Sequence, residues 1–255
     1  MGTWRQLEIS GKSADVFEPS RPSPHGFTVL FLHGHGEITL RDNPWYSAEF
    51  DRYGLRCVCP GGRRSWWGDR VCREFDQVVT PQRFLKENVV SWLETNGGVK
   101  PPQIALLGVS MGGQGALKLA YLDPARFPVV AAIAPAIDFY VWHGRGYPLD
   151  EIYESAEAAR QDTATVLIHP LNWPRHQLLV CDPGDAEWFE GAERLASKLS
   201  LTGIPFERDF ETRSGGHTWD YFNHQAPAVV RFLAERLEKE RIRLPVTGPQ
   251  FTMGE

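Results

Sequence analysis

The sequence predicts an α/β fold in which a mostly parallel sheet is covered by helices on both faces. Strand-like and helix-like segments alternate along most of the 255 residues, and parallel strands need such helical crossover connections. The segment PQIALLGVS contains the continuously apolar run Ile104-Ala105-Leu106-Leu107, which is typical of a strand buried on both faces. Because this length is sufficient for one sizeable core, we expect a single domain over residues 1–241.

Each expected element rests on a local pattern. The stretch WRQLEISGKSADVFEP indicates two short strands joined by a turn at Ser10-Gly11-Lys12. A Pro-rich loop follows, and together these make up residues 1–26. The remaining expected strands are 27–32, 55–59, 103–109, 128–134, 176–181 and 205–211, and the expected helices are 44–52, 81–95, 111–122, 187–200 and 219–241.

Residues 139–174 interrupt the alternation. This segment includes YVWHGRGYPLDEIYESAEAARQD, which combines aromatic residues and glycines with one helix-like stretch. We expect it to form an excursion over one end of the sheet. The final residues, LPVTGPQFTMGE, indicate a loose C-terminal tail over 242–255.

The charge and hydropathy of the chain exclude several classes of partner. The 32 acidic and 27 basic residues give a formal net charge of -5 without a long block of one sign, which argues against a surface for nucleic acid or anionic membrane. The N-terminus lacks a basic region followed by an apolar core, and no segment has the apolar length needed to span a bilayer. We therefore expect a soluble, cytoplasmic protein, and the sequence leaves open a homo-oligomer.

The cysteines indicate buried, reduced thiols rather than a disulfide or metal framework. Cys57, Cys59, Cys72 and Cys181 form no C-x-x-C pair. Cys57 and Cys59 alternate with Val58 in a strand-like run, so both are expected on one face of the strand. This usage is typical of a cytosolic protein.

The sharpest motif is Gly108-Val109-Ser110-Met111-Gly112, between a predicted buried strand and a predicted helix. A G-x-S-x-G sequence in this context places its serine on a tight, strained turn at the carboxyl edge of the sheet, where flanking glycines avoid steric clashes. The pattern predicts that Ser110 is a nucleophile.

A serine nucleophile needs a base and a group that orients the base. On this kind of sheet the chain order is serine, acid, histidine. His217 follows two glycines and precedes a helix, which favours it as the base. The turn Asp182-Pro183-Gly184-Asp185 follows a strand, and its geometry favours Asp185 as the acid over Asp182, with Asp138 as a third alternative.

The stretch FLHGHGE, which contains His33 and His35, admits two interpretations. Two histidines at a strand end could bind a divalent metal in a barrel hydrolase, but that reading leaves the Ser110 motif unexplained. Alternatively, Gly34 and Gly36 let the backbone turn, so that the amide of His35 joins that of Met111 in an oxyanion hole. We favour the second interpretation, with no metal and with His33 in a structural role. Whether the His35 ring also touches substrate stays open.

Residues 27–235 resemble the esterase D-type branch of the α/β-hydrolase superfamily, which includes S-formylglutathione hydrolases, tributyrin esterases and feruloyl or acetyl-xylan esterases. The similarity rests on FLHGHGE, on IALLGVSMGGQGALKLAYLDPARFPVVAAIAPAID, on CDPGD and on GGHTWDYF. It implies the α/β-hydrolase fold, the triad Ser110, Asp185 and His217, and no cofactor. The loop after His33 differs from the one usual in S-formylglutathione hydrolases, which makes glutathione thioesters a poorer fit.

The resemblance implies a serine carboxylesterase acting on small-acyl or aryl esters as small-molecule partners. Two alternatives are an acyltransferase on the same scaffold and a non-catalytic binding protein of this fold. Candidate substrate-binding residues are Trp142 and His143 in the excursion, Trp66 and Trp67 in RRSWWGD, and Trp219 next to the base. A tryptophan near a cleft can stack on an aryl or sugar group, although buried tryptophans are equally common.

Overall fold

One eight-stranded sheet runs through the computed structural model, which describes residues 1–243. The strands are β1 (Thr3–Ile9), β2 (Lys12–Glu18), β3 (Thr28–Leu32), β4 (Arg56–Pro60), β5 (Ile104–Val109), β6 (Val129–Ile133), β7 (His176–Val180) and β8 (Glu207–Asp209). Their order across the sheet is β1-β2-β4-β3-β5-β6-β7-β8. Strand β2 pairs antiparallel with β1 and β4, and all the other pairs are parallel. The mostly parallel sheet is therefore as predicted.

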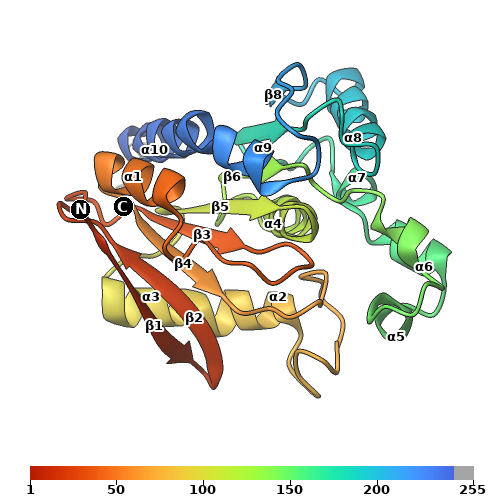
Figure 1. Cartoon of the computed structure of the whole chain (residues 1–255), viewed down its shortest axis with the longest axis horizontal. Coiled ribbons are helices and arrows are strands. Elements are labelled where there is room, and N and C mark those ends of the chain that lie inside the picture. The colour runs from red at the N-terminus through yellow and green to blue at the C-terminus, as the bar shows by residue number, and fades with distance from the viewer. Residues whose placement is uncertain (244–255) are drawn as a thin grey trace, which may run out of the picture.

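Helices cover both faces of this sheet. They are α1 (Pro44–Tyr53), α2 (Pro81–Arg83), the π-helical turn η1 (Phe84–Val89), α3 (Val90–Gly97), α4 (Met111–Leu122), α8 (Phe189–Leu201), α9 (Trp219–His224) and α10 (Ala226–Ile242). Helices α1 and α10 contact each other on one face, and α2 and α3 lie on the other (Figure 1). None of the helices in residues 1–243 has the length and apolar character that crossing a membrane requires.

The core consists of two layers separated by the sheet. On β3, Val29 and Phe31 belong to one hydrophobic cluster and Leu30 and Leu32 to the other, and all four are fully buried. Alternate side chains of a strand point to opposite faces, so a strand buried on both faces must be apolar at every position. The thiols of the β4 pair, Cys57 and Cys59, lie on one face with their Sγ atoms 3.7 Å apart.

Three elements differ from the sequence-based expectation. The helix expected over 81–95 contains the π-helical turn η1, and the strand expected over 205–211 is reduced to β8. The helix expected over 219–241 is divided at Gln225 into α9 and α10. Pro227 lies in the first turn of α10, where a residue without an N–H is tolerated, whereas inside a continuous helix it would remove a hydrogen bond.

The segment 139–174 is an excursion built from four short helical turns. These are η2 (Phe139–Trp142), α5 (Leu149–Ile152), α6 (Ala156–Gln161) and α7 (Ala164–Leu167). Figure 1 shows α5 and α6 beyond the end of the sheet to which the arrowheads of β3 and β5 point. The buried Lys118 of α4 pairs with Asp162, which also accepts the Tyr153 hydroxyl hydrogen bond at 2.5 Å. The expected tail over 242–255 lies, from residue 244 onward, outside the described residues.

Candidate active site

Ser110 occupies the sharp turn between β5 and α4. Its backbone has φ 54° and ψ -120°, a strained conformation for a residue with a side chain. The neighbouring glycines are required by space, because a Cβ on Gly108 would lie 2.0 Å from the carbonyl oxygen of Gly112, and one on Gly112 would lie 1.9 Å from that of Leu32. Close packing of β3, β5 and α4 thus holds Ser110 at the carboxyl edge of the sheet.

A chain of hydrogen bonds links Ser110 to His217 and Asp185. The Ser110 Oγ lies 2.9 Å from the Nε2 of His217, and the Nδ1 of His217 lies 2.7 Å from the Oδ2 of Asp185. Because the carboxylate can only accept, Nδ1 carries the proton and Nε2 is free to accept from the serine hydroxyl. The Oδ1 of Asp185 accepts the N–H groups of Glu187 and Trp188, each at 3.1 Å.

The other aspartate of this turn, Asp182, holds the loop that carries the histidine. Its Oδ1 accepts the N–H of Gly184 at 2.6 Å, and its Oδ2 accepts those of Ser214 at 2.6 Å and Gly216 at 2.9 Å. Burial raises the pKa of Asp182, but these three donors outweigh burial, and the net shift is downward. One buried carboxylate therefore ties the acid turn to the loop before His217.

Asp138 lies away from the histidine. Its Oδ2 is 3.0 Å from the guanidinium of Arg194, and it packs against Gly191 of α8. Burial raises the pKa of Asp138, which Arg194 opposes and Glu190 reinforces. The structure thus brings Asp185, rather than Asp182 or Asp138, into contact with His217.

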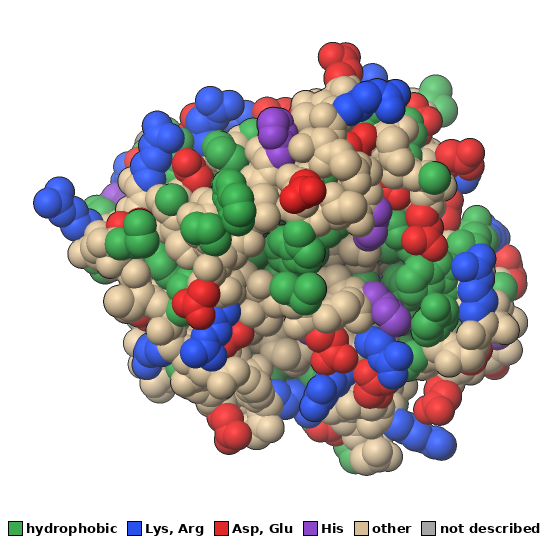
Figure 2. Space-filling view, in the orientation of Figure 1, with side chains coloured by type: hydrophobic (Ala, Val, Ile, Leu, Met, Phe, Trp, Pro, Cys, Tyr) green, Lys and Arg blue, Asp and Glu red, His purple; other side chains and the backbone are tan. Residues whose placement is uncertain are grey.

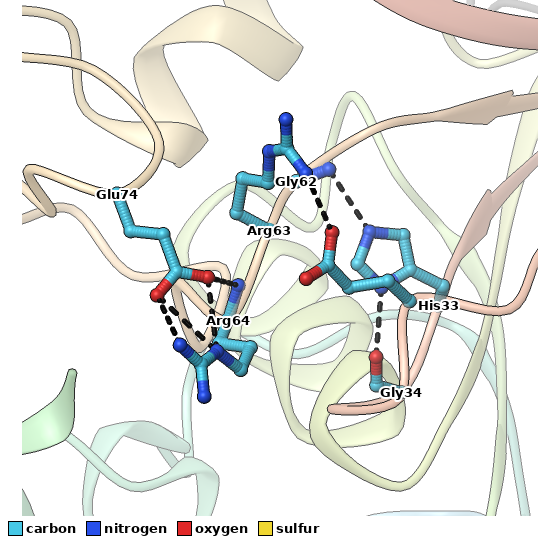
Figure 3. Close-up of polar contacts among 7 residues, drawn as sticks. His33, Gly34, Gly62, Arg63, Arg64 and Glu74 are labelled. Atoms are coloured by element: carbon cyan, nitrogen blue, oxygen red, sulfur yellow. Dashed lines mark hydrogen bonds and ion pairs between the residues drawn. The ribbon is translucent and has the colours of Figure 1, made fainter. Parts of the chain in front are cut away.

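His33 is fixed inside the loop that follows β3. Its Nε2 accepts the N–H of Gly62 at 2.9 Å, and its Nδ1–H donates to the carbonyl of Gly34 at 2.8 Å (Figure 3). The indole N–H of Trp67 donates to the His33 carbonyl at 3.0 Å. Burial lowers the pKa of His33, which maintains the neutral ring that these bonds need. Both nitrogens are therefore engaged in a structural role.

One ion pair joins the same loop region to residues 61–74, and a second lies within that segment. Arg63 lies 3.3 Å from Glu37, and Arg64 lies 2.7 Å from Glu74. In Figure 3 the Arg64 guanidinium faces the Glu74 carboxylate side by side, which is the bidentate geometry of a strong pair. Together with the His33 bonds, the Arg63–Glu37 pair restricts the backbone around Gly34.

Gly34, which precedes His35, and Met111 both lie next to Ser110. A Cβ on Gly34 would be 3.3 Å from the Ser110 Cβ, so the chain entering His35 passes directly beside the serine. Met111 is the first residue of α4, where N–H groups lack partners within the helix. Within residues 1–243, neither N–H donates to another loop carbonyl.

A cleft of about 250 Å³ opens above Ser110 and His217. Its walls are mainly apolar and include Ile38, Trp188 and Phe222. Figure 2 shows hydrophobic side chains grouped around a hollow on this face of the molecule. A mostly apolar concavity with a few convergent polar groups is typical of a small-molecule site.

A family model described as "Putative esterase" matches residues 72–233, which is more than half of the chain. The chain belongs to this esterase family. The matched region contains Ser110, Asp185 and His217, and the expectation of an esterase-type hydrolase is confirmed at the level of the family.

One curated relative and two solved structures illustrate what this esterase-family chain resembles. The diacylglycerol acyltransferase/mycolyltransferase Ag85A of Mycobacterium tuberculosis is 33% identical over 139 residues, which cover 52% of this chain but only 40% of the relative. The fluorophosphonate-binding serine hydrolase FphF of Staphylococcus aureus superposes with a TM-score of 0.74 at 14% identity, covering 91% of this chain and 98% of that one. An S-formylglutathione hydrolase from Agrobacterium tumefaciens gives 0.73 at 18% identity, covering 92% and 94%. These similarities confirm the α/β-hydrolase fold.

Among the tryptophans predicted to bind substrate in this esterase-family chain, two line the cleft. Trp142 and Trp219 contribute to its walls. Trp66 and Trp67 are 2% and 0% exposed and lie beneath the surface, so the structure does not bring them to the cleft. Trp66 stacks on Phe139 at 5.0 Å between ring centroids. Trp66 also packs edge-on against Trp142 of the cleft wall, whereas Trp67 packs against His33.

His143 also lies outside the cleft. Its Nε2 is 2.9 Å from the carbonyl oxygen of Tyr153, and this bond closes the excursion on itself. The structure thus places the His143 ring against the backbone of a neighbouring turn and does not bring it among the residues that line the cleft. Its neighbour Trp142 faces the cleft instead.

Sequence reasoning missed Ile38, Glu187, Trp188 and Phe222 as residues of the cleft. Two of them carried a usable signal. Trp188 is three residues after Asp185, and Phe222 lies on the same face of α9 as Trp219 because residues three apart on a helix are neighbours.

The ring of His35 forms part of an aromatic cluster at the cleft. Its centroid lies 5.3 Å from that of Trp142 and 5.2 Å from that of Tyr147, both edge-on. Burial, assisted by Arg64, lowers the pKa of His35. The two histidines thus have different partners: both ring nitrogens of His33 form hydrogen bonds to the backbone, whereas the His35 ring packs against aromatic side chains.

Proposed function

We propose that this chain is a serine carboxylesterase that hydrolyses small-acyl or aryl esters through an acyl-enzyme. One observation carries the proposal: Ser110, His217 and the buried Asp185 form a hydrogen-bonded series, and its Ser110 and His217 line an apolar cleft. This arrangement matches the requirements for an activated serine, namely a base within reach and a buried carboxylate that orients it.

In the first half-reaction, the Nε2 of His217 removes the Ser110 proton as Oγ attacks the ester carbonyl. Asp185 keeps the proton of the imidazole on Nδ1 and stabilises the imidazolium that forms. The amides of His35 and Met111 donate to the developing oxyanion, and preorganised donors of this kind are commonly the largest single contribution to catalysis. The imidazolium then protonates the leaving alcohol.

In the second half-reaction, water takes the place of the alcohol. His217 removes a proton from the water as it attacks the acyl-enzyme, and the same amides stabilise the second tetrahedral intermediate. Ser110 is then released with its proton restored by His217. The residues of the chain supply every proton transfer in this scheme, so it uses neither a metal nor an organic cofactor.

The test is hydrolysis of short and medium p-nitrophenyl esters by the wild type and Ser110→Ala, with and without a chelator. Loss of a triad serine lowers kcat by up to about 10⁶-fold in a studied protease. Ser197→Ala, an exposed serine on α8, is the matched control and should keep wild-type rates. Unchanged turnover in Ser110→Ala, or loss of wild-type activity on adding the chelator, would refute the serine mechanism.

A second candidate is acyl transfer to an alcohol, which is favoured by the 33% identity to a diacylglycerol acyltransferase/mycolyltransferase. Water and an alcohol compete for one acyl-enzyme, so the two functions differ in partitioning and not in the first half-reaction. Hydrolysis in the presence of increasing glycerol, with both products quantified, distinguishes them. An esterase keeps free acid as the main product, whereas an acyltransferase forms mainly the new ester.

A further inference from the structure

The carboxylate of Glu187 is held at the wall of the cleft. The indole N–H of Trp142 donates to its Oε1 at 2.7 Å, and its own backbone N–H donates to Asp185 at 3.1 Å. The residue is thus fixed both through its main chain, by the acid turn, and through its side chain, by the excursion. Glu187 cannot turn away from the cleft without losing the bond to Trp142.

The remaining surface of the cleft offers no charge that would offset this carboxylate. Within residues 1–243, the side chains lining the cleft include neither lysine nor arginine, and apart from the two histidines Glu187 is the only titratable one. The ring of His35 is favoured in its neutral form, because burial and Arg64 both lower its pKa. A ligand in the cleft therefore meets one negative charge, which the exposed side chain of Glu187 carries beside apolar walls.

We propose that the cleft selects neutral or cationic esters over anionic ones, and that Glu187 sets this selectivity. The inference rests on the proposed esterase function, because it describes which esters that site accepts. Two like charges about 4 to 6 Å apart in water-like surroundings repel enough to change a rate about threefold to sixfold. Because the Glu187 side chain is exposed to solvent, this water-like range applies, and salt reduces the effect.

The experiment compares three phenyl acetates that differ at the meta position. These are 3-acetoxybenzamide, 3-acetoxybenzoate and 3-acetoxyphenyl trimethylammonium, which are neutral, anionic and cationic but similar in size. The value of kcat/KM is measured for each ester with the wild type and with Glu187→Gln. This substitution removes the charge, while the glutamine Oε1 can still accept the bond from Trp142. Intrinsic reactivity cancels, because every protein is compared on the same esters.

The matched control is Glu190→Gln. Glu190 is an exposed carboxylate in the first turn of α8, and it does not line the cleft. The substitution Glu190→Gln removes the same net charge from the protein, only three positions away from Glu187 along the chain. A local effect of Glu187 can thereby be separated from a change in the overall field.

We expect Glu187→Gln to raise the anionic-to-neutral ratio of kcat/KM about threefold to sixfold and to lower the cationic-to-neutral ratio by a similar factor. The wild-type preference should also weaken in 0.5 M salt. Equal ratios in the wild type and Glu187→Gln, or an equal effect of Glu190→Gln, would overturn the inference while leaving the esterase function intact. A wild type that hydrolyses none of the three esters would instead refute the proposed function, and the inference with it.

Discussion

Replacing Asp185 by asparagine tests the role of the buried acid most directly. The asparagine would keep its Oδ1 on the N–H groups of Glu187 and Trp188, because its amide group would otherwise face two donors. Its Nδ2 then donates to the Nδ1 of His217. The proton of the imidazole is thereby moved to Nε2, which can no longer accept from Ser110.

The expected size of the effect follows from this change of tautomer. In a serine protease the equivalent substitution leaves the geometry intact and lowers kcat about 10⁴-fold, which corresponds to about 5 kcal/mol of lost transition-state stabilisation. We expect a similar loss for Asp185→Asn. Because asparagine fills the same fully buried space, the urea midpoint should change little.

The assay measures kcat on a p-nitrophenyl ester together with urea unfolding for Asp185→Asn, Asp182→Asn and Asp138→Asn. Asp182→Asn loses acceptors for the loop before His217, and a 1 Å displacement of a reacting group costs about 10²-fold. It should also lower stability by about 1–3 kcal/mol. Asp138→Asn, whose carboxylate pairs with Arg194, should retain kcat within a few-fold.

The reasoning would be refuted by a folded Asp185→Asn protein that retains more than about a tenth of wild-type kcat. It would also be refuted if Asp182→Asn, with native-like unfolding, lost more kcat than Asp185→Asn. Either result would move the role of the acid to another carboxylate.

Two further predictions concern stability. Asp162→Ala leaves the buried ammonium of Lys118 without its partner and should lower the free energy of unfolding in urea by about 3–5 kcal/mol. The double variant with Lys118→Met should recover most of this stability. Equal losses in the single and double variants would contradict the prediction. Burial raises the pKa of Asp209, but hydrogen bonds from Thr212 and Gln225 outweigh it and bring the pKa to about 2, below its unfolded value of about 3.9. The stabilisation by ionised Asp209 is therefore complete above the unfolded pKa and is lost as the pH falls from about 4 toward 2. The difference in unfolding free energy between the wild type and Asp209→Asn should shrink over that pH range. A difference that stays constant with pH would disprove the prediction.

Much of the fold can be predicted from the sequence, because the patterns that indicate strands and helices are local. A fully apolar run such as Ile104 to Leu107 can only be a strand or helix buried on all sides, and the adjoining glycines restrict the choice. The division of the last helix into α9 and α10 also has a local signal, because Pro227 lies in the first turn of α10. The helical periodicity on both sides of Pro227 nevertheless predicted one continuous helix. The structure confirms the expected mostly parallel sheet and the helices that connect its strands.

The candidate site was predictable where a backbone requirement singled out a residue. Ser110 is marked by glycines that no larger residue could replace, and His217 by the two glycines before it. The structure brings both into hydrogen-bond contact, and their catalytic roles stay a prediction for the substitutions above. No comparable backbone requirement distinguishes the tryptophans. Trp66 and Trp142 are the same residue type, with the same hydropathy, although one faces the core and the other the cleft.

The sequence alone therefore predicts the layered α/β fold, the tight turn at Ser110 and the order of the candidate catalytic residues along the chain. The turn geometry favoured Asp185 over Asp182, but only the tertiary structure shows which of the two contacts His217, places Trp142 rather than Trp66 at the cleft, and sets Glu187 on its wall. The physical reason is that these assignments depend on contacts between segments far apart in sequence. Asp182 and Gly216 are separated by 34 positions, and no local periodicity records which of two neighbouring carboxylates turns toward the histidine.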